Sequence, residues 1–229
     1  MYPVVLWIFL LAVTTPSISA QSISAQSVST RSASDREEGY QKAMTDAISL
    51  LEKAADKQTY LDCAGRFERI SVAEKDRWIP LYYGAYSLII LSFSEEDGQQ
   101  KDLILDRAQK NLDASLERAP DESELHVLQA FLYPSRILVD PAGRGMEYMG
   151  KMSASLERAR SLDPENPRIY YLEGVQILNL PPSMGGGAEM ARPILETALK
   201  YFEKVVAEDP LLPHWGEQAT RDELSKLNQ

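Results

Sequence analysis

Few side chains in this sequence have the types and spacings needed to carry out catalysis or hold a metal. The two histidines, His126 and His214, lie far apart in the chain, and neither has a second histidine or a cysteine at a zinc-site spacing. Ser135 and Ser183 lack the flanking glycines of a nucleophile elbow. The single cysteine, Cys63, occupies an apolar helix position, so we expect it to be buried. The sequence therefore predicts a protein that is not an enzyme and that has no metal site and no cofactor.

Three consecutive glycines, Gly185, Gly186 and Gly187, form the most conspicuous loop motif. Glycines directly before a helix can present backbone N–H groups to an anion. Here no Lys–Ser/Thr pair follows them, and Glu189 would repel an anion. We therefore expect a tight turn with positive φ angles, which glycine adopts without strain. A binding role for this loop stays open, because loops on a rigid scaffold often carry binding residues.

A second predicted loop, residues 134–145, carries the charged side chains Arg136, Asp140 and Arg144. Together they could bind a carboxylate ligand. They could also be structural, with Asp140 capping the next helix and an Arg–Asp ion pair holding the loop in place. We favour the structural interpretation and keep all three residues as candidates.

The elements that position these residues are revealed by an internal repeat. The sequence ASLERA occurs at residues 114–119 and again at 154–159, and looser versions begin at Phe67 and Phe202. Apolar residues around these positions recur at i, i+3, i+4 and i+7, which predicts amphipathic helices. Self-similarity at such spacing indicates stacked supersecondary units.

A second set of helices alternates with the first. Gly84, Ala130 and Gly174 occupy equivalent positions in this set, each flanked by apolar residues. A small residue there allows two helix backbones to approach closely. The sequence thus predicts an all-α fold that alternates an A helix, with a small residue, and a B helix, with an aromatic or leucine anchor.

This alternation resembles the tetratricopeptide repeat (TPR), whose B helix ends in a Phe-Glu-Lys-Ala-like stretch closed by Asp-Pro. Pro164 follows Leu156, and Pro210 follows Phe202, at the spacing of that family. Residues 125–217 also resemble a group of exported bacterial TPR proteins with no assigned activity. The resemblance implies an α-solenoid of about four antiparallel helix pairs. Because the step within each repeat is longer than in the family, we expect long loops between the A and B helices.

Stacked helical hairpins form a concave face lined by A helices, which commonly receives a peptide. We therefore expect a scaffold protein with a protein or peptide partner. Aromatic and arginine side chains supply much of the energy of such interfaces. The candidate partner-binding residues of the A helices are Trp78, Tyr83, Tyr86, Tyr133, Arg136 and Tyr170. For about half of the tyrosines we expect packing between helices instead.

Two other hypotheses stay open. The triple glycine also resembles the periplasmic TPR components of TRAP-type transporters, which implies a small-molecule binder. A closed apolar pocket would favour this reading, and an open groove would favour the peptide. The third possibility is a homo-oligomer formed through residues 214–227, where Trp215 and Leu224 could pair with a second copy.

The first 20 residues predict a secretory signal peptide. Residues 4–13 form an apolar run that is too short to span a bilayer core of roughly 30 Å, and a small-residue site ends at Ala20. Cleavage after Ala25 is the alternative. Residues 21–34 are mostly Ser, Ala, Gln and Thr, which predicts a disordered leader before a helical domain over residues 35–229. We therefore expect an exported, periplasmic or secreted protein that does not insert in a membrane once the signal is removed.

The charge excludes one class of partner. The chain has 34 acidic and 24 basic residues, for a net charge of −10. A surface of this sign repels phosphate backbones, so we expect no binding to nucleic acid.

Overall fold

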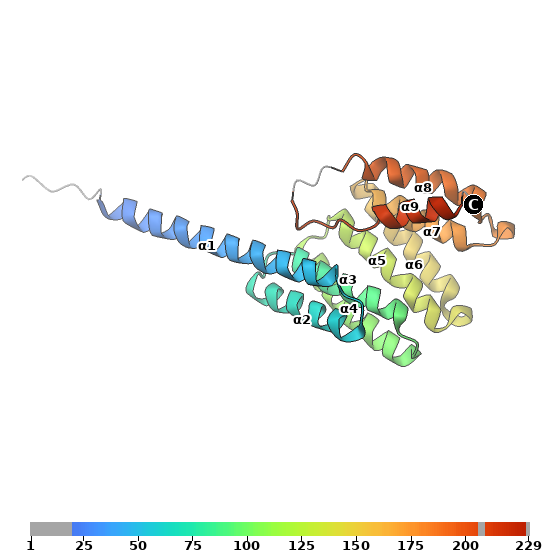
Figure 1. Cartoon of the computed structure of the whole chain (residues 1–229), viewed down its shortest axis with the longest axis horizontal. Coiled ribbons are helices and arrows are strands. Elements are labelled where there is room, and N and C mark those ends of the chain that lie inside the picture. Colours follow the sequence, from blue (N-terminus) through green and yellow to red (C-terminus); the bar gives the residue numbers. More distant parts are fainter. Residues whose placement is uncertain (1–19, 206–208, 228–229) are drawn as a thin grey trace, which may run out of the picture. The chain divides into compact units, whose positions relative to one another are not determined.

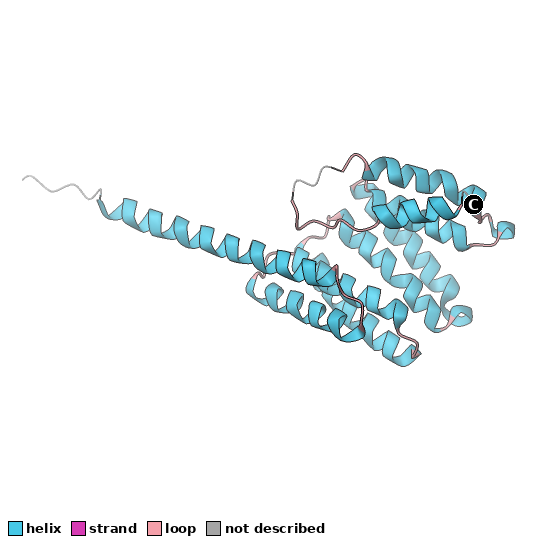
Figure 2. Ribbon diagram, viewed as in Figure 1, coloured by secondary structure: helices cyan, strands magenta, loops and turns pink. Residues whose placement is uncertain are grey.

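The computed structural model describes residues 20–205 and 209–227 (Figure 1). Within these ranges the chain contains nine α-helices, one short 3-10 helix and no strand (Figure 2). The all-α class predicted from the sequence is therefore confirmed. No helix among the described residues is both long and apolar enough to cross a membrane. The predicted signal peptide lies outside the described residues, apart from Ala20.

The helices follow one another along the chain. Their bounds are α1 (Ala20–Leu51), α2 (Lys57–Ala73), α3 (Ile79–Ser94), α4 (Gly98–Arg118), α5 (Ser123–Val139), α6 (Pro141–Leu162), α7 (Pro167–Asn179), η1 (Pro182–Met184), α8 (Ala188–Phe202) and α9 (Glu217–Lys226) (Figure 1).

The chain divides into two units, residues 1–39 and residues 40–229. In the first unit, residues 20–39 are helical and belong to α1. This helix includes residues 21–34, for which the sequence predicts a disordered leader, and the domain start expected at residue 35; both bounds stay predictions. No glycine or proline lies between residues 20 and 38 to interrupt the helix, which continues to Leu51.

The second unit is a series of helices packed in chain order. Each of α2, α3, α4, α5 and α6 lies against the next helix or the one before it, and α7, α8 and α9 do the same. In addition, α3 lies beside α5, and α5 beside α7. The A helices α3, α5 and α7 thus form one layer. This is the stacked-hairpin architecture predicted from the repeat.

The small residues of the A helices mark close helix crossings. A Cβ atom added to Gly174 of α7 would lie 2.6 Å from Cδ2 of Leu195 in α8. One added to Gly84 of α3 would lie 3.0 Å from Nδ2 of Asn111 in α4. Real Cβ atoms do not approach other heavy atoms as closely as the first of these. Glycine at residue 174 is therefore what lets α7 and α8 pack.

The buried side chains form two hydrophobic clusters within the second unit. The larger cluster draws on α1 to α5 and includes Met44, Cys63 and Phe67, none of which has exposed surface. The smaller cluster draws on α5, α6 and α7 and includes the B-helix anchor Leu156. The predicted burial of Cys63 is confirmed. Leu211, which lies beyond the last B helix, belongs to the larger cluster, and so brings the C-terminal segment to the N-terminal repeats.

The prediction of long loops between A and B helices is wrong for two of the three connections. Only residues 95–97 separate α3 from α4, and only Asp140 separates α5 from α6. The additional residues lengthen the B helices instead, to 21 residues in α4 and 22 in α6. Asp97 and Asp140 make such short connections possible, because their side chains accept hydrogen bonds from the first turns of α4 and α6. The α7–α8 connection, residues 180–187, is the one extended loop of the three.

Candidate functional site

Residues 209–216, which precede α9, lie against the layer of A helices. The Tyr83 hydroxyl of α3 donates a hydrogen bond to the carbonyl oxygen of Leu212 at 3.1 Å. The indole Nε1 of Trp215 donates one to the Tyr82 hydroxyl at 2.7 Å. Gly216 ends the segment with a φ of 105°, a conformation that favours glycine, and α9 begins directly after it. The segment therefore places Trp215 against α3.

Trp215 is the centre of an aromatic cluster with contributions from three A helices. Its ring stacks on Tyr86 of α3 at 5.5 Å between centroids and on Phe131 of α5 at 5.1 Å. Tyr171 of α7 meets it edge-on at 6.3 Å. We call Tyr82, Tyr86, Phe131, Tyr171 and Trp215 the Trp215 cluster. The rings are held by packing and by the Trp215–Tyr82 hydrogen bond, so they form a rigid aromatic surface.

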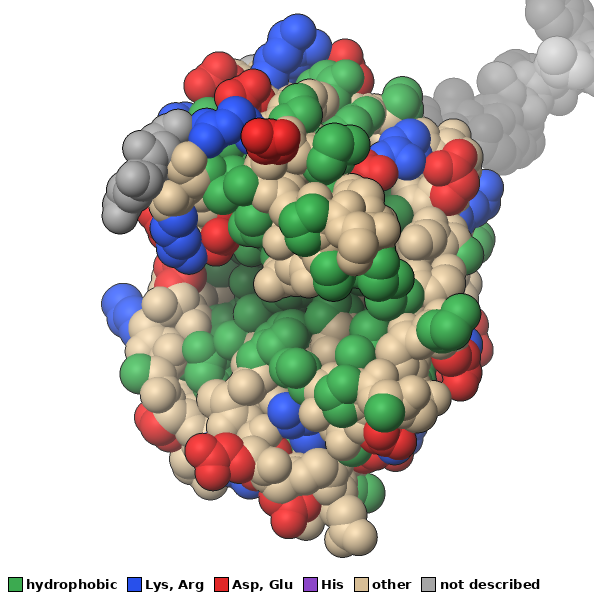
Figure 3. Space-filling model, turned by 90° about the vertical axis from the view of Figure 1, so that its right-hand side faces the viewer, with side chains coloured by type: hydrophobic (Ala, Val, Ile, Leu, Met, Phe, Trp, Pro, Cys, Tyr) green, Lys and Arg blue, Asp and Glu red, His purple; other side chains and the backbone are tan. Residues whose placement is uncertain are grey.

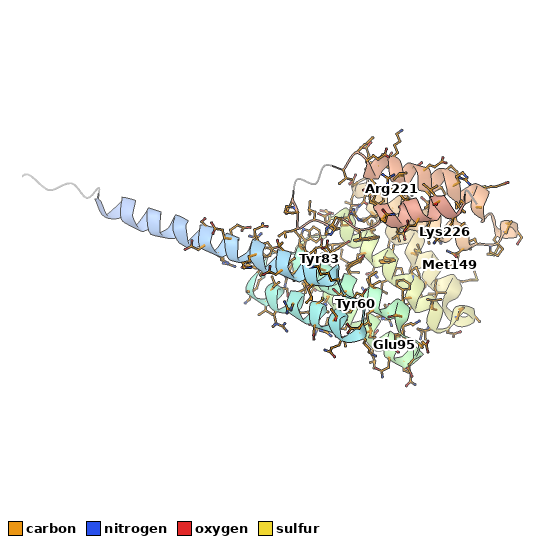
Figure 4. The ribbon with its side chains drawn as sticks, viewed as in Figure 1. Tyr60, Tyr83, Glu95, Met149, Arg221 and Lys226 are labelled. Atoms are coloured by element: carbon orange, nitrogen blue, oxygen red, sulfur yellow. The ribbon has the colours of Figure 1, made fainter. Side chains whose placement is uncertain are left out.

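A cavity of about 320 Å³ lies beside this cluster. It is lined by Ile48, Leu51, Glu52, Ala54, Tyr60, Tyr83, Tyr86, Ile90, His214 and Trp215. Tyr60 belongs to α2 and Tyr83 to α3, and both are labelled in Figure 4. We call this space the Trp215 cavity. Neither Lys nor Arg is among its described lining residues. Hydrophobic side chains also line a hollow on the face of the molecule that Figure 3 draws, where no histidine is visible.

The polar groups of the cavity include one imidazole and one carboxylate, which contact each other. Nε2 of His214 lies 2.8 Å from Oε1 of Glu52. The two side chains are 48% and 52% exposed, so the pair lies at the mouth of the cavity. Nδ1 of His214 lies 3.4 Å from the carbonyl oxygen of Leu212. Both ring nitrogens of His214 thus face acceptor groups.

The buried tyrosines near the cavity remain protonated at neutral pH. Burial raises the pKa of the Tyr83 and Tyr86 phenols, against a smaller opposing effect of the Arg168 charge. Burial also raises the pKa of Tyr82 well above its ordinary value. These three hydroxyls therefore act as neutral hydrogen-bonding groups.

Arg168 contacts both Pro213 and the ring of Trp215, and so holds the segment before α9 in place. Arg168 is 4% exposed, and its Nη1 lies 2.9 Å from Oε1 of Glu124. It also donates a hydrogen bond to the carbonyl oxygen of Pro213, and its Cζ lies 5.3 Å from the Trp215 ring centroid. Burial raises the pKa of Glu124, and the Arg168 charge opposes this shift. Arg168 therefore positions Trp215 rather than facing the Trp215 cavity.

Two further cavities, of about 400 and 300 Å³, border the same segment. The larger one is lined by several charged side chains that already have partners. Lys204 lies 3.1 Å from Glu165, and Arg168 pairs with Glu124. The Trp215 cavity differs in combining apolar and aromatic walls with a few polar groups, the usual composition of a small-molecule site.

The predicted partner-binding residues do not share one surface. Tyr83 and Tyr86 line the Trp215 cavity. Trp78 packs edge-on against the ring of Tyr82, and the other two predicted tyrosines pack elsewhere. The ring centroid of Tyr133 lies 5.6 Å from that of Tyr148 in α6, and the ring centroid of Tyr170 lies 5.0 Å from that of Tyr201 in α8. Two of the predicted aromatic residues thus line the cavity, and the other three pack on aromatic neighbours elsewhere.

Arg136 and Arg144 hold helices together. Arg136 is buried and contacts Asp102 and Asp106 of α4 at 2.6 and 2.5 Å. Arg144 makes two hydrogen bonds of 2.8 Å to the Asp102 carboxylate, which keep the pKa of Asp102 below its usual range. Asp140 caps α6, as the structural interpretation predicted. The ion pair joins the arginines to Asp102, however, and not to Asp140.

The triple glycine forms a tight turn. Gly185 and Gly187 have φ angles of 80° and 100°. The N–H groups of all three glycines donate hydrogen bonds to backbone carbonyls, that of Gly187 to Ile177 of α7 at 2.9 Å. The amides that an anion would need are therefore used within the protein.

Sequence reasoning did not identify Glu52, Tyr60 or His214 as residues of one site. They come from the ends of α1 and α2 and from the segment after α8, so no local pattern connects them. The one local signal that could have drawn attention to this segment is the sequence His-Trp-Gly at residues 214–216, directly after the last repeat. Among the described residues, no group of three or more His, Cys, Asp or Glu side chains is placed to hold a metal ion.

The comparisons with known proteins concern this fold. The chain matches no protein-family model and no curated protein sequence. Among solved structures it is similar to the HusA haemophore from Porphyromonas gingivalis. The TM-score is 0.71 and the sequence identity 28%, over 83% of this chain and 92% of that chain. The TPR family suggested by the repeat is thus not confirmed, whereas the helical, repeat-like architecture is, and the chain shares that architecture with a haemophore.

Proposed function

We propose that the chain is an exported carrier that binds haem, or a closely related planar porphyrin, at the Trp215 cavity. The observation that carries this proposal is the composition of the cavity. Aromatic rings of Tyr60, Tyr86 and Trp215 stand beside aliphatic side chains, and His214 supplies an imidazole at the mouth. The similarity to the HusA haemophore supports the same ligand class.

The physical basis is the match between a flat, apolar ring system and fixed aromatic walls. Aromatic side chains bury a large area and stack on planar groups with little loss of conformational entropy. The Trp215 cluster keeps Tyr86 and Trp215 nearly parallel, with an interplanar angle of 19°. A porphyrin would therefore lie against rings that are already ordered.

The size of the cavity determines how the ligand would lie. Its volume of about 320 Å³ is at the lower end of the range of small-molecule pockets, roughly 300–1,000 Å³. A macrocycle of haem size would thus insert one edge among Ile48, Leu51 and Ile90 and leave the opposite edge in solvent. A carrier that must release its ligand is suited to such partial burial.

The proposal is one of binding without catalysis, in an exported protein. The apolar run and small-residue site of residues 4–20 support export, to the periplasm or the medium. The expectation that the chain is not an enzyme stays a prediction, as does self-association through residues 214–227.

A peptide partner on the A helices is the less favoured alternative. A peptide would need the surface of α3, α5 and α7, and Trp215 already contacts Tyr86, Phe131 and Tyr171 of these three helices. The chain's own segment thus occupies part of that surface. This contact favours the small-molecule hypothesis.

A haemin titration of the purified full chain tests the proposal. We expect saturable 1:1 binding, seen as a shift of the Soret absorbance and quenching of tryptophan fluorescence. Tyr86→Ala should weaken binding on the order of tenfold, because it removes one of the stacking rings. Tyr170→Ala is the matched control, since Tyr170 packs on Tyr201 away from the cavity. Non-saturable binding, or equal affinity in both variants, would contradict the proposal.

A further inference from the structure

Few of the side chains that line the Trp215 cavity are of a type that binds haem iron. Haem iron in proteins is held by His, Cys, Met or Tyr side chains. His214 is the one histidine among the described lining residues, and neither Cys nor Met is among them. Cys63, the only cysteine of the chain, has no exposed surface. The choice is therefore between His214 and the tyrosines.

The tyrosines are poorer candidates. A phenol binds ferric iron as a phenolate, and burial raises the pKa of both Tyr83 and Tyr86, which disfavours that form. Tyr83 also uses its hydroxyl in a hydrogen bond to Leu212. A neutral imidazole offers a lone pair at physiological pH and is the commonest metal ligand. Tyr60 is the one other phenol at the cavity, and it needs a direct test.

The surroundings of His214 suit coordination through Nε2. In metal-bound histidines, the second ring nitrogen usually donates its proton to a carboxylate or a backbone carbonyl. Nδ1 of His214 lies 3.4 Å from the carbonyl oxygen of Leu212, which can accept that proton. With Nδ1 protonated, the lone pair of Nε2 is available for iron.

Glu52 competes for the same nitrogen. Its Oε1 lies 2.8 Å from Nε2 of His214. An ionised carboxylate only accepts hydrogen bonds, so this contact requires a proton on Nε2. In the neutral imidazole, iron binding then breaks the Nε2–H···Oε1 hydrogen bond and moves the proton, through solvent, from Nε2 to Nδ1. The Fe–Nε2 bond forms with no net release of a proton.

We infer that His214 is the axial ligand of bound haem iron, and that Glu52 is a competing partner which holds the imidazole when the cavity is empty. The inference rests on the proposed function and deepens it by naming the iron ligand. Both side chains are about half exposed, so either can move without disturbing the core.

The test compares ferric haem with metal-free protoporphyrin IX in His214→Ala, Glu52→Ala and Tyr60→Phe variants of the full chain. Affinities come from fluorescence titration and iron ligation from the Soret and visible spectra. In His214→Ala, haem affinity should fall at least about tenfold, since losing even a hydrogen-bond partner of a metal ligand typically costs about 10–100-fold. The imidazole-ligated spectrum should disappear, and added imidazole should restore it. Protoporphyrin affinity should stay within about twofold. In Glu52→Ala, haem affinity should rise several-fold and protoporphyrin affinity should not change.

The outcomes separate the inference from the proposed function. If haem and protoporphyrin both bind and His214→Ala keeps the wild-type haem spectrum, the inference is wrong and the proposed function stands. A loss of the ligated spectrum in Tyr60→Phe alone would assign the iron ligand to Tyr60. If neither compound binds the wild-type chain, both proposals fail. Circular dichroism melting curves verify that each variant is folded.

Discussion

Nε1 of Trp215 donates a hydrogen bond of 2.7 Å to the hydroxyl of Tyr82, although 133 residues separate the two in the chain. Tyr82 is fully buried in α3, in the larger hydrophobic cluster. The bond therefore ties the segment after the last helix pair to the first half of the stack. It also orients the indole ring so that one edge is fixed and its faces meet Tyr86 and Phe131.

This relationship leads to a prediction for Trp215→Phe. The substitution keeps an aromatic ring but removes the donor, so the buried Tyr82 hydroxyl loses its partner. We expect the free energy of unfolding to fall by about 1–2 kcal/mol. Trp215→Ala, which also removes the ring contacts, should cost about 3 kcal/mol. Urea denaturation followed by circular dichroism measures both. Equal effects of the two substitutions would show that the ring contacts contribute nothing.

The crossing of α7 and α8 gives a second prediction. In Gly174→Ala the new Cβ would lie 2.6 Å from Leu195, so we expect a loss of about 1–3 kcal/mol of unfolding free energy from overpacking. Gly150→Ala, in α6, is the matched control because no atom lies within 4 Å of its added Cβ. That control should be neutral or stabilising by up to about 1 kcal/mol, as alanine favours helix. A tolerated alanine at residue 174 would contradict the close crossing.

The stacked architecture was predictable from the sequence because it depends on local patterns. Helical periodicity, the repeated ASLERA and the small residues at 84, 130 and 174 are each readable within one or two helices. The loops were less predictable. Pro134 and the glycines Gly143 and Gly145 suggested a break in the chain, yet α5 runs past Pro134 and α6 includes both glycines. Packing against α4, through Arg136 and Arg144, holds these helices.

The site was harder to predict than the fold. The sequence predicts Tyr83 and Tyr86 as partner-binding residues of an A helix. Their role at a cavity depends on a segment more than a hundred residues later, which packs on them through Leu212 and Trp215. Such a contact follows from how many helix pairs the chain has and how they curve. No local pattern in the sequence encodes it.

The Asp102 network predicts a pH dependence of stability. Hydrogen bonds from Arg144 and Arg136 lower the pKa of Asp102 in the folded state relative to the unfolded chain. A lowered pKa stabilises the fold above the unfolded value, near pH 4, and this stabilisation is lost as the pH falls through the folded value. Asp102→Asn should therefore cost about 2 kcal/mol at pH 7 and less at pH 3. Denaturation at both pH values measures the difference, and a pH-independent cost would contradict it.

Export makes a separate prediction about the N-terminus. Expressed with its own leader in a secreting host, the protein should begin at Gln21, or at Gln26 if cleavage follows Ala25. Mass spectrometry of the intact exported protein gives the answer. A mature protein that still begins with Met1 would refute the signal peptide, without affecting the haem-binding proposal.

The charged residues that line the Trp215 cavity predict where the propionate groups of a bound haem lie. The cavity's described lining residues include Glu52 and neither Lys nor Arg, so no lysine or arginine of the cavity wall would pair with a propionate. The propionates of bound haem should then point to solvent, and protoporphyrin IX and its dimethyl ester should bind with similar affinity. A charged hydrogen bond to a propionate is worth roughly 1.5–3 kcal/mol, so a loss greater than about tenfold on esterification would reveal one. Fluorescence titration in dilute detergent, with the free acid as the reference, distinguishes the two results.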